Sequence, residues 1–256
     1  LSLAIAFAVE LLNDRVRTPS DVMRHLHVPL LGSICHVEDD QDVTKLELTH
    51  VVRQAPYSIM SECYRQLRTN LKLSKEGTEH KSLLVTSPGA GDGKTTTAVN
   101  LCSTLISESK KVLLIDANFR RPTSGSLFPH RNDSGQITEH ADYGLSNYLM
   151  GQCTDENQII RESDIPGLDI IDSGPLPSTP SQLLESPRLK QLLDACKEQY
   201  DHVIIDGPAL LVTDAKSLAS QTDGTIVVFC SESTQRGAAE RILRELKNID
   251  ANVVGS

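Results

Sequence analysis

The stretch of the sequence most clearly able to do chemistry is a glycine-rich loop followed by Lys94 and Thr95. The apolar run 83–86 before it predicts a buried strand, and residues 96–108 after it carry apolar residues at helical spacing. In that context backbone N–H groups and the helix N-terminus point at an anion, Lys94 balances phosphate charge and the Thr95 hydroxyl can bind Mg²⁺. We therefore predict a nucleotide site formed by Gly89, Ala90, Gly91, Asp92, Gly93, Lys94, Thr95 and Thr96.

Two further predicted strands, at residues 111–116 and 202–206, end in aspartates, Asp116 and Asp206. The carboxyl ends of parallel strands form the crevice where open α/β sheets bind ligands. A carboxylate there, beside a phosphate loop, can hold Mg²⁺ directly or through water. The alternatives are that Asp206 only caps the following turn, and that the loop is merely flexible, since Pro88 stands where the usual Gly-x-x-x-x-Gly-Lys-Thr pattern has glycine. The two strand ends favour the nucleotide site.

Strands and helices alternate along the chain, which predicts an α/β fold with a mostly parallel sheet and helices on both faces. The helix predicted at residues 58–73 has an apolar residue at every fourth position, namely Ile59, Cys63, Leu67 and Leu71. Three charged residues fall three apart on its opposite side, namely Glu62, Arg65 and Arg68. On an isolated helix these charges would form only a solvated face, with ion pairs worth about 0.2–0.5 kcal/mol each.

Composition excludes several classes of function. The net charge of −9 argues against a general nucleic-acid binder, which needs a basic surface. The six cysteines contain no Cys-x-x-Cys pair, and no histidines are spaced as metal ligands. The sequence therefore predicts neither a zinc site nor a disulfide framework, and the cysteines fit a reducing compartment.

The pattern divides the chain into three parts. Residues 1–12 are almost entirely apolar and too short to span a bilayer alone, so they are either the end of a transmembrane helix, which we favour, or a buried helix. Residues 13–54 are expected to be a juxtamembrane segment, with a helix start at Thr18-Pro19-Ser20-Asp21 and an acidic linker at 37–50. Residues 55–256 are expected to form the nucleotide-binding domain, with a mobile loop at 123–142 and a C-terminus truncated inside a strand at 252–254.

Four ordered motifs resemble those of the bacterial tyrosine kinases of polysaccharide export. The first motif in chain order is Glu62-x-x-Arg65-x-x-Arg68, which matches the family's E-x-x-R-x-x-R motif. Residues 87–95 match its Walker A loop, residues 112–120 match its Walker A′ motif, and residues 203–206 match its Walker B motif. The second acid of the family's Asp-x-Asp Walker A′ motif is Asn118 here. The related positioning ATPases of the MinD/ParA group carry a lysine where this chain has Gly89, which favours the kinase branch.

The resemblance implies an enzyme that transfers the γ-phosphoryl group of ATP to a protein tyrosine hydroxyl. Lys94 would hold the phosphates, and Thr95 and Asp206 would secure Mg²⁺. Asp116 would contact the metal shell or accept the tyrosine proton. The candidate catalytic residues are therefore Lys94, Asp116 and Asp206, and the candidate metal ligands are Thr95, Asp116 and Asp206.

The resemblance also implies partners. Glu62, Arg65 and Arg68 would assemble a ring of kinase domains, with the arginines pairing across the interface rather than within the chain. Residues 1–32 look like the end of a transmembrane helix and juxtamembrane segment of a fused chain-length-determinant part, which implies the cytoplasmic face of the bacterial inner membrane. The substrates would be tyrosine-containing proteins, including neighbouring copies of the chain, whose tyrosines would be phosphorylated in trans. No nucleic acid is expected. Two alternatives stay open: a nucleotide-dependent scaffold or regulatory ATPase of the same export machinery and, more distantly, a soluble positioning ATPase.

Overall fold

The computed structural model describes residues 15–74, 80–131, 137–138, 143–210, 213–231 and 233–256. A seven-stranded sheet runs through the centre of the molecule in the order β5-β6-β2-β7-β1-β8-β9, and only the edge strand β5 is antiparallel to its neighbour. The strands are β1 (Ser82–Thr86), β2 (Val112–Asp116), β5 (Ile160–Glu162), β6 (Leu168–Ile171), β7 (His202–Asp206), β8 (Gly224–Val227) and β9 (Val253–Gly255). A separate two-stranded pair is formed by β3 (His130–Arg131) and β4 (Ile137–Thr138).

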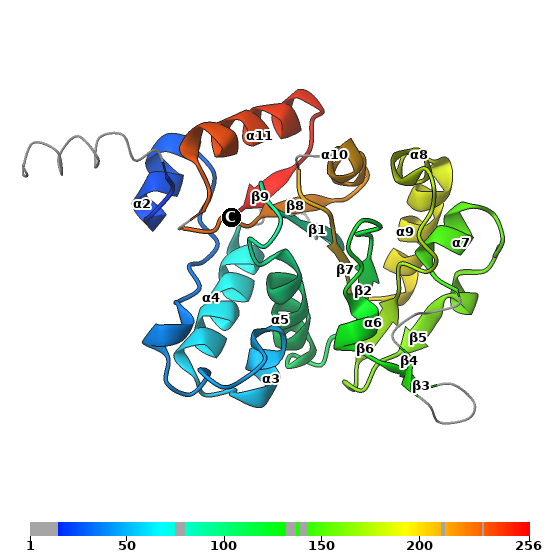
Figure 1. The fold of residues 1–256 in the computed structure, drawn as a ribbon, viewed down its shortest axis with the longest axis horizontal. Helices are drawn as coiled ribbons and strands as arrows, with labels where there is room; N and C mark the ends of the chain where they lie inside the picture. Colours follow the sequence, from blue (N-terminus) through cyan, green and yellow to red (C-terminus); the bar gives the residue numbers. More distant parts are fainter. Residues whose placement is uncertain (1–14, 75–79, 132–136, 139–142, 211–212, 232) are drawn as a thin grey trace, which may run out of the picture.

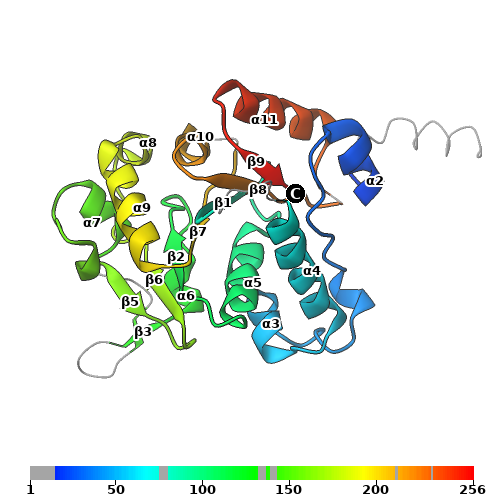
Figure 2. The same cartoon turned by 180° about the vertical axis from the view of Figure 1, so that it is seen from behind.

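Helices cover both faces of the sheet, as Figures 1 and 2 show from opposite sides. The helices α4 (Ile59–Leu73) and α5 (Lys94–Ile106) pack on one face, whereas α9 (Pro187–Gln199), α10 (Thr213–Ala219) and α11 (Arg236–Asn248) pack on the other. Because both faces are covered, every residue of the central strands β1, β2 and β7 is buried, which explains their continuous apolar sequences. The predicted α/β fold is confirmed.

Shorter helices join these elements. The α-helical ones are α2 (Pro19–Asp21), α3 (Val51–Gln54), α6 (Ser124–Leu127), α7 (Leu145–Leu149) and α8 (Pro180–Leu184). A π-helical turn covers Val22–Leu26, and 3₁₀ turns cover Val37–Asp39, Leu48–His50 and Glu156–Gln158. The predicted helix start is confirmed, because the Thr18 hydroxyl accepts the Asp21 N–H and the Asp21 carboxylate accepts the Thr18 N–H.

The segment 37–50 is not a linker, and that prediction is wrong. Val43 and Val51 have no exposed surface and pack against α4. The buried amide of Asn100, in the middle of α5, donates to the Leu48 carbonyl at 2.8 Å and accepts the Val52 N–H at 3.0 Å. The acidic sequence contains isolated apolar residues without a helical or strand period, and these residues meet only when the chain is folded. The predicted domain boundary at residue 55 therefore lies inside a packed unit.

The segment at 29–34 lies beside the C-terminus of the described chain. The Leu31 N–H donates to the Ser256 carbonyl at 2.7 Å, and the Ser256 N–H donates to the Pro29 carbonyl at 2.9 Å. Residues 1–12, predicted to end a transmembrane helix, lie outside the described residues. Among the residues that are described, no helix combines the length and the apolar character that crossing a bilayer would require.

The buried stripe of α4 is rotated from the predicted one. Ile59 is 58% exposed and Cys63 is only partly buried, so these two residues lie at the rim. The buried hydrophobic residues of α4 are Met60, Tyr64, Leu67 and Leu71. A strict spacing of four drifts by about 40° per step on a helix of 3.6 residues per turn, which carries residues 63 and 59 progressively away from the packed face.

Candidate active site

The glycine-rich loop connects the end of β1 to the first turn of α5. Gly91 and Gly93 adopt left-handed conformations with φ of +87° and +91°, which a side chain would strain, and Gly93 directly precedes the first helical residue, Lys94. These two glycines therefore set the turn that brings the loop amides and the α5 N-terminus to one place.

The Lys94 side chain folds back into this loop and is buried. Its Nζ donates to the Ser87 hydroxyl at 3.1 Å and to the Gly89 carbonyl at 3.0 Å. Burial lowers the pKa of Lys94, and the charges of Asp206 and Asp92 act against that shift. The Asp92 carboxylate accepts the Gly89 N–H at 2.7 Å, so an anion entering the loop would have to compete with Asp92 for that amide.

Asp206, at the end of β7, lies against the start of α5. The Thr95 hydroxyl donates to its Oδ2 at 2.6 Å, and the other oxygen, Oδ1, is buried without a hydrogen-bond partner. Burial, together with the neighbouring Asp116, raises the pKa of Asp206 to about 7. A buried carboxylate oxygen left unpaired in this way is suited to receive a cation or a proton.

Asp116 lies opposite Asp206 in the register of β2 and β7. Its two oxygens accept backbone N–H groups from Asn118 at 3.1 Å, Thr123 at 2.8 Å and Ser124 at 2.9 Å. Burial raises the pKa of Asp116, and these hydrogen bonds oppose the shift. The predicted mobile loop thus begins with an anchored segment that leads into α6, and its residues 132–136 and 139–142 lie outside the described residues.

The residues present fit a magnesium ion. Within the described part of the chain, no three His, Cys, Asp or Glu side chains are grouped so as to hold a metal by themselves. Mg²⁺ in phosphoryl-transfer sites needs fewer protein ligands, because it is bound through one or two carboxylates, waters and the phosphates of the substrate. The unpaired Oδ1 of Asp206 and the adjacent Thr95 hydroxyl supply such a partial set.

Two functional candidates near the site were missed at the sequence level. Arg120, in the loop after β2, donates through Nε to Asp214 of α10 at 2.9 Å, and Ser181 of α8 also donates to Asp214. The Asp214 side chain is 2% exposed, whereas that of Arg120 is 51% exposed. The pair joins the loop after β2 to the first turn of α10. No local pattern links residues 94 positions apart in the chain, so no sequence signal could have paired them.

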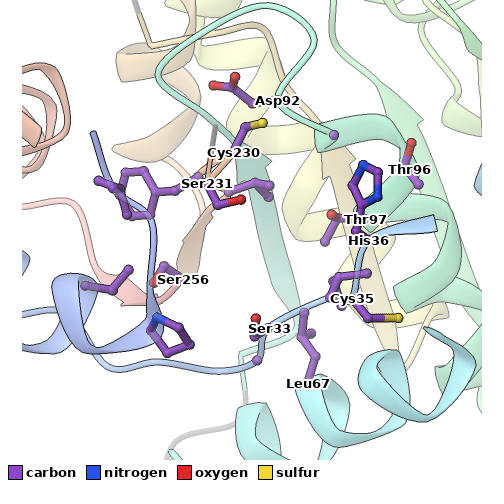
Figure 3. A pocket seen from close by; sticks show the side chains of 18 of the residues that line it. Ser33, Cys35, His36, Leu67, Asp92, Thr96, Thr97, Cys230, Ser231 and Ser256 are labelled. Atoms are coloured by element: carbon purple, nitrogen blue, oxygen red, sulfur yellow. The ribbon is translucent and has the colours of Figure 1, made fainter. Parts of the chain in front are cut away.

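A cavity of about 490 Å³ adjoins the outer side of the glycine-rich loop (Figure 3). Thr96 and Thr97 of α5 line it on one side, and Cys230 and Ser231, which follow β8, line it on another. The segment 32–37 and Leu67 of α4 also line the cavity. The cavity thus adjoins the loop and also borders the part of the predicted juxtamembrane segment at 32–37.

The charged residues of α4 find partners inside the single chain. Arg65 pairs with Glu62 at 2.7 Å and donates to the Pro56 carbonyl at 2.8 Å. Arg68 donates to the Thr104 carbonyl of α5 at 2.7 Å and lies 3.4 Å from the Glu108 carboxylate. In the single chain both arginines thus have partners within the chain, contrary to that part of the expectation, and their pairing across an interface stays a prediction.

Comparison with known proteins places the chain in a family. A family described as an AAA domain matches residues 81–254. The tyrosine-protein kinase YwqD of Bacillus subtilis is 33% identical over 214 residues, which cover 83% of this chain and 86% of YwqD. The chain belongs to the bacterial tyrosine-protein kinases. The putative tyrosine-protein kinase EpsB of Ralstonia nicotianae is 28% identical along 100% of this chain, which spans about a third of EpsB (34%).

A solved structure agrees with this family assignment. The kinase domain of the Escherichia coli tyrosine kinase ETK superposes with a TM-score of 0.81 at 26% identity, and the match covers 94% of this chain and 92% of the ETK chain. The predicted family and the predicted enzyme class are confirmed.

Proposed function

We propose that this kinase transfers the γ-phosphoryl group of ATP to tyrosine hydroxyls of proteins, including other copies of itself, in the control of exopolysaccharide or capsule synthesis and export. The observation that carries the proposal is the contact of Thr95 with Asp206 beside a phosphate loop closed by Lys94. Its parts match the needs of phosphoryl transfer, in which positioning and charge stabilisation supply most of the catalysis.

Each side chain has a proposed role. Lys94 exchanges its contacts with Ser87 and Gly89 for phosphate oxygens, and the loop amides orient the same phosphates. Thr95 and Asp206 hold Mg²⁺, which when bound neutralises charge on the β- and γ-phosphates. Asp116 adds a second carboxylate beside Asp206, and it anchors the segment at Thr123 and Ser124 by accepting their N–H groups. Asp206 Oδ1, unpaired in the described structure, is the oxygen best placed to receive the metal or the tyrosine proton.

The cavity beside the loop is proposed to receive the base and ribose of the nucleotide. Thr96, the last residue of the predicted phosphate-binding set, lines the cavity, so the space begins where the phosphates would end. A volume of about 490 Å³ lies in the usual range for cofactor pockets, which are mostly apolar. The cavity wall at 32–37 would then place the N-terminal segment in contact with the bound nucleotide.

The wider assembly is also a proposal. Glu62, Arg65 and Arg68 are proposed to contribute to a ring of kinase domains, and residues 1–12 to belong to a membrane-spanning part at the cytoplasmic face of the bacterial inner membrane. Residues 13–54 and 55–256 are proposed to differ in function, as a juxtamembrane segment and a nucleotide-binding domain. They are not separate folding units, because the two stretches pack together.

A second candidate function is a nucleotide-dependent scaffold or regulatory ATPase of the same machinery. Asn118 favours it, since a neutral amide at the second Walker A′ position cannot supply charge to a metal. Incubation with γ-labelled ATP, Mg²⁺ and a tyrosine-rich acceptor peptide separates the two, with Lys94→Ala as control. Label on tyrosine that is absent from the variant supports the kinase. Released phosphate without labelled tyrosine favours the ATPase, and full peptide labelling by Lys94→Ala refutes the site.

A further inference from the structure

The five tyrosines of the chain differ sharply in accessibility. Tyr64, Tyr148 and Tyr200 are buried, with 2%, 6% and 4% of their surface exposed, and the Tyr200 hydroxyl donates to the Asp169 carboxylate at 2.7 Å. Tyr57 is 97% exposed and Tyr143 is 60% exposed. A hydroxyl group can enter the active site of another molecule only if its side chain can leave its own surface. The folded chain therefore offers Tyr57 and Tyr143 as acceptors and withholds the other three.

Of the two, Tyr57 is presented by a defined turn. The Ser58 N–H donates to the Ala55 carbonyl at 3.1 Å, so that Pro56 and Tyr57 occupy the two central positions of a reverse turn. The ends of the turn are held, because the Ala55 N–H donates to the Val51 carbonyl and the Ser58 hydroxyl caps α4. The tyrosine is thus projected from a well-anchored turn rather than from the packed face of a helix.

The charges around this turn suit a phosphate group on the ring. Arg65 donates to the Pro56 carbonyl at 2.8 Å, which places its guanidinium one peptide unit from Tyr57. The N-terminus of the fifteen-residue helix α4 follows directly and favours negative charge. A phosphate on Tyr57 would compete with Glu62 for Arg65, and it would add negative charge to the same surface of α4 that we propose for assembly.

We propose that Tyr57 is a phosphorylation site, modified in the active site of a second copy of this chain. This inference rests on the proposed function. The phenolic oxygen of Tyr57 forms a bond to the γ-phosphorus of ATP, and the bond from that phosphorus to the bridging oxygen breaks. ADP leaves with the electron pair, and the phenolic proton passes to a strand-end carboxylate of the transferring copy.

The experiment uses the full chain with Mg²⁺ and ATP, and it compares Tyr57→Phe with Tyr143→Phe. Each variant removes one hydroxyl from an exposed ring, so both should fold like the parent. Mass spectrometry of digested protein is expected to find phosphate on Tyr57. Tyr57→Phe should lose at least half of the label carried by the chain, whereas Tyr143→Phe should keep most of it. Both should label an added tyrosine peptide at the rate of the parent.

A mixing experiment tests transfer between copies. Tyr57→Phe serves as the active donor and Lys94→Ala as the acceptor, so phosphate on Tyr57 can come only from another molecule. Label on Tyr57 of the acceptor supports the proposal. If the peptide is labelled but Tyr57 is not, or if Tyr57 is labelled in the parent and never in the mixture, the inference is overturned and the kinase function stands. If neither the peptide nor the chain is labelled, the proposed function fails and the inference with it.

Discussion

Replacing Asp206 by asparagine is expected to make the metal-free protein more stable while removing phosphoryl transfer. The carboxylate is buried beside Asp116, and its pKa is raised from 3.8 to about 7. Between those two values the folded state holds a proton that the unfolded state has released, so stability falls as the pH rises through this window. Above pH 7 the Asp206 carboxylate is ionised in the folded state, so the full free-energy cost of burying its charge is present. Asparagine carries no charge and removes this cost.

The size of the effect follows from the shift. A difference of about 3 pH units between folded and unfolded pKa corresponds to about 4 kcal/mol, at 1.36 kcal/mol per unit. Asparagine keeps an oxygen that can accept the Thr95 hydroxyl but loses the attraction between Asp206 and Lys94. We therefore expect a net gain of about 1–3 kcal/mol in the free energy of unfolding at pH 8, and little gain near pH 4.

Urea unfolding at pH 4.5 and pH 8, without Mg²⁺ or nucleotide, measures this difference. Asp223→Asn is the matched control, because Asp223 is shifted in the opposite direction. Burial alone would raise its pKa, but the Ser82 N–H and Lys197 hold it below the usual value, so asparagine there should destabilise the protein at pH 8. If Asp206→Asn is no more stable than the parent at pH 8, or gains equally at both pH values, our account of the buried carboxylate is refuted.

Three further predictions test other parts of the structure. Asn100→Ala should lower the free energy of unfolding by about 1–3 kcal/mol in a urea titration, because it leaves buried backbone groups of the segment 48–52 unpaired; no change would mean that the segment is a linker after all. Gly93→Ala should lower the free energy of unfolding by about 1–2 kcal/mol, because φ of Gly93 is left-handed, and it should weaken binding of a fluorescent ATP analogue. Gly89→Ala should lower the free energy of unfolding and the affinity for the analogue less, because φ of Gly89 is not positive. The double variant Arg65→Ala and Arg68→Ala should lower the mass of the assembly in light scattering, and an unchanged mass would remove these residues from the proposed interface.

The predictable part of this protein lies in local patterns. The strand at 202–206 has the bounds that its apolar run predicts, because the run reports the residues that the strand must bury. The chemistry of the phosphate loop is equally local, since glycines, Lys94 and Thr95 act within one turn of backbone. The family and the fold could therefore be predicted from the sequence alone.

What only the tertiary structure decided is which distant groups meet. Burial in the sheet raises the pKa of both strand-end aspartates, and the register of β2 and β7 sets Asp116 against Asp206, which raises the pKa of Asp206 further. The sequence shows only that each aspartate ends a strand. The packing of α5 against the segment 48–52 turns a predicted linker into part of the core. The turn at 55–58 exposes Tyr57, while packing hides three other tyrosines of the same chemistry. Periodicity along the chain specifies which side of an element is buried, but contacts between elements depend on how those sides are placed in space.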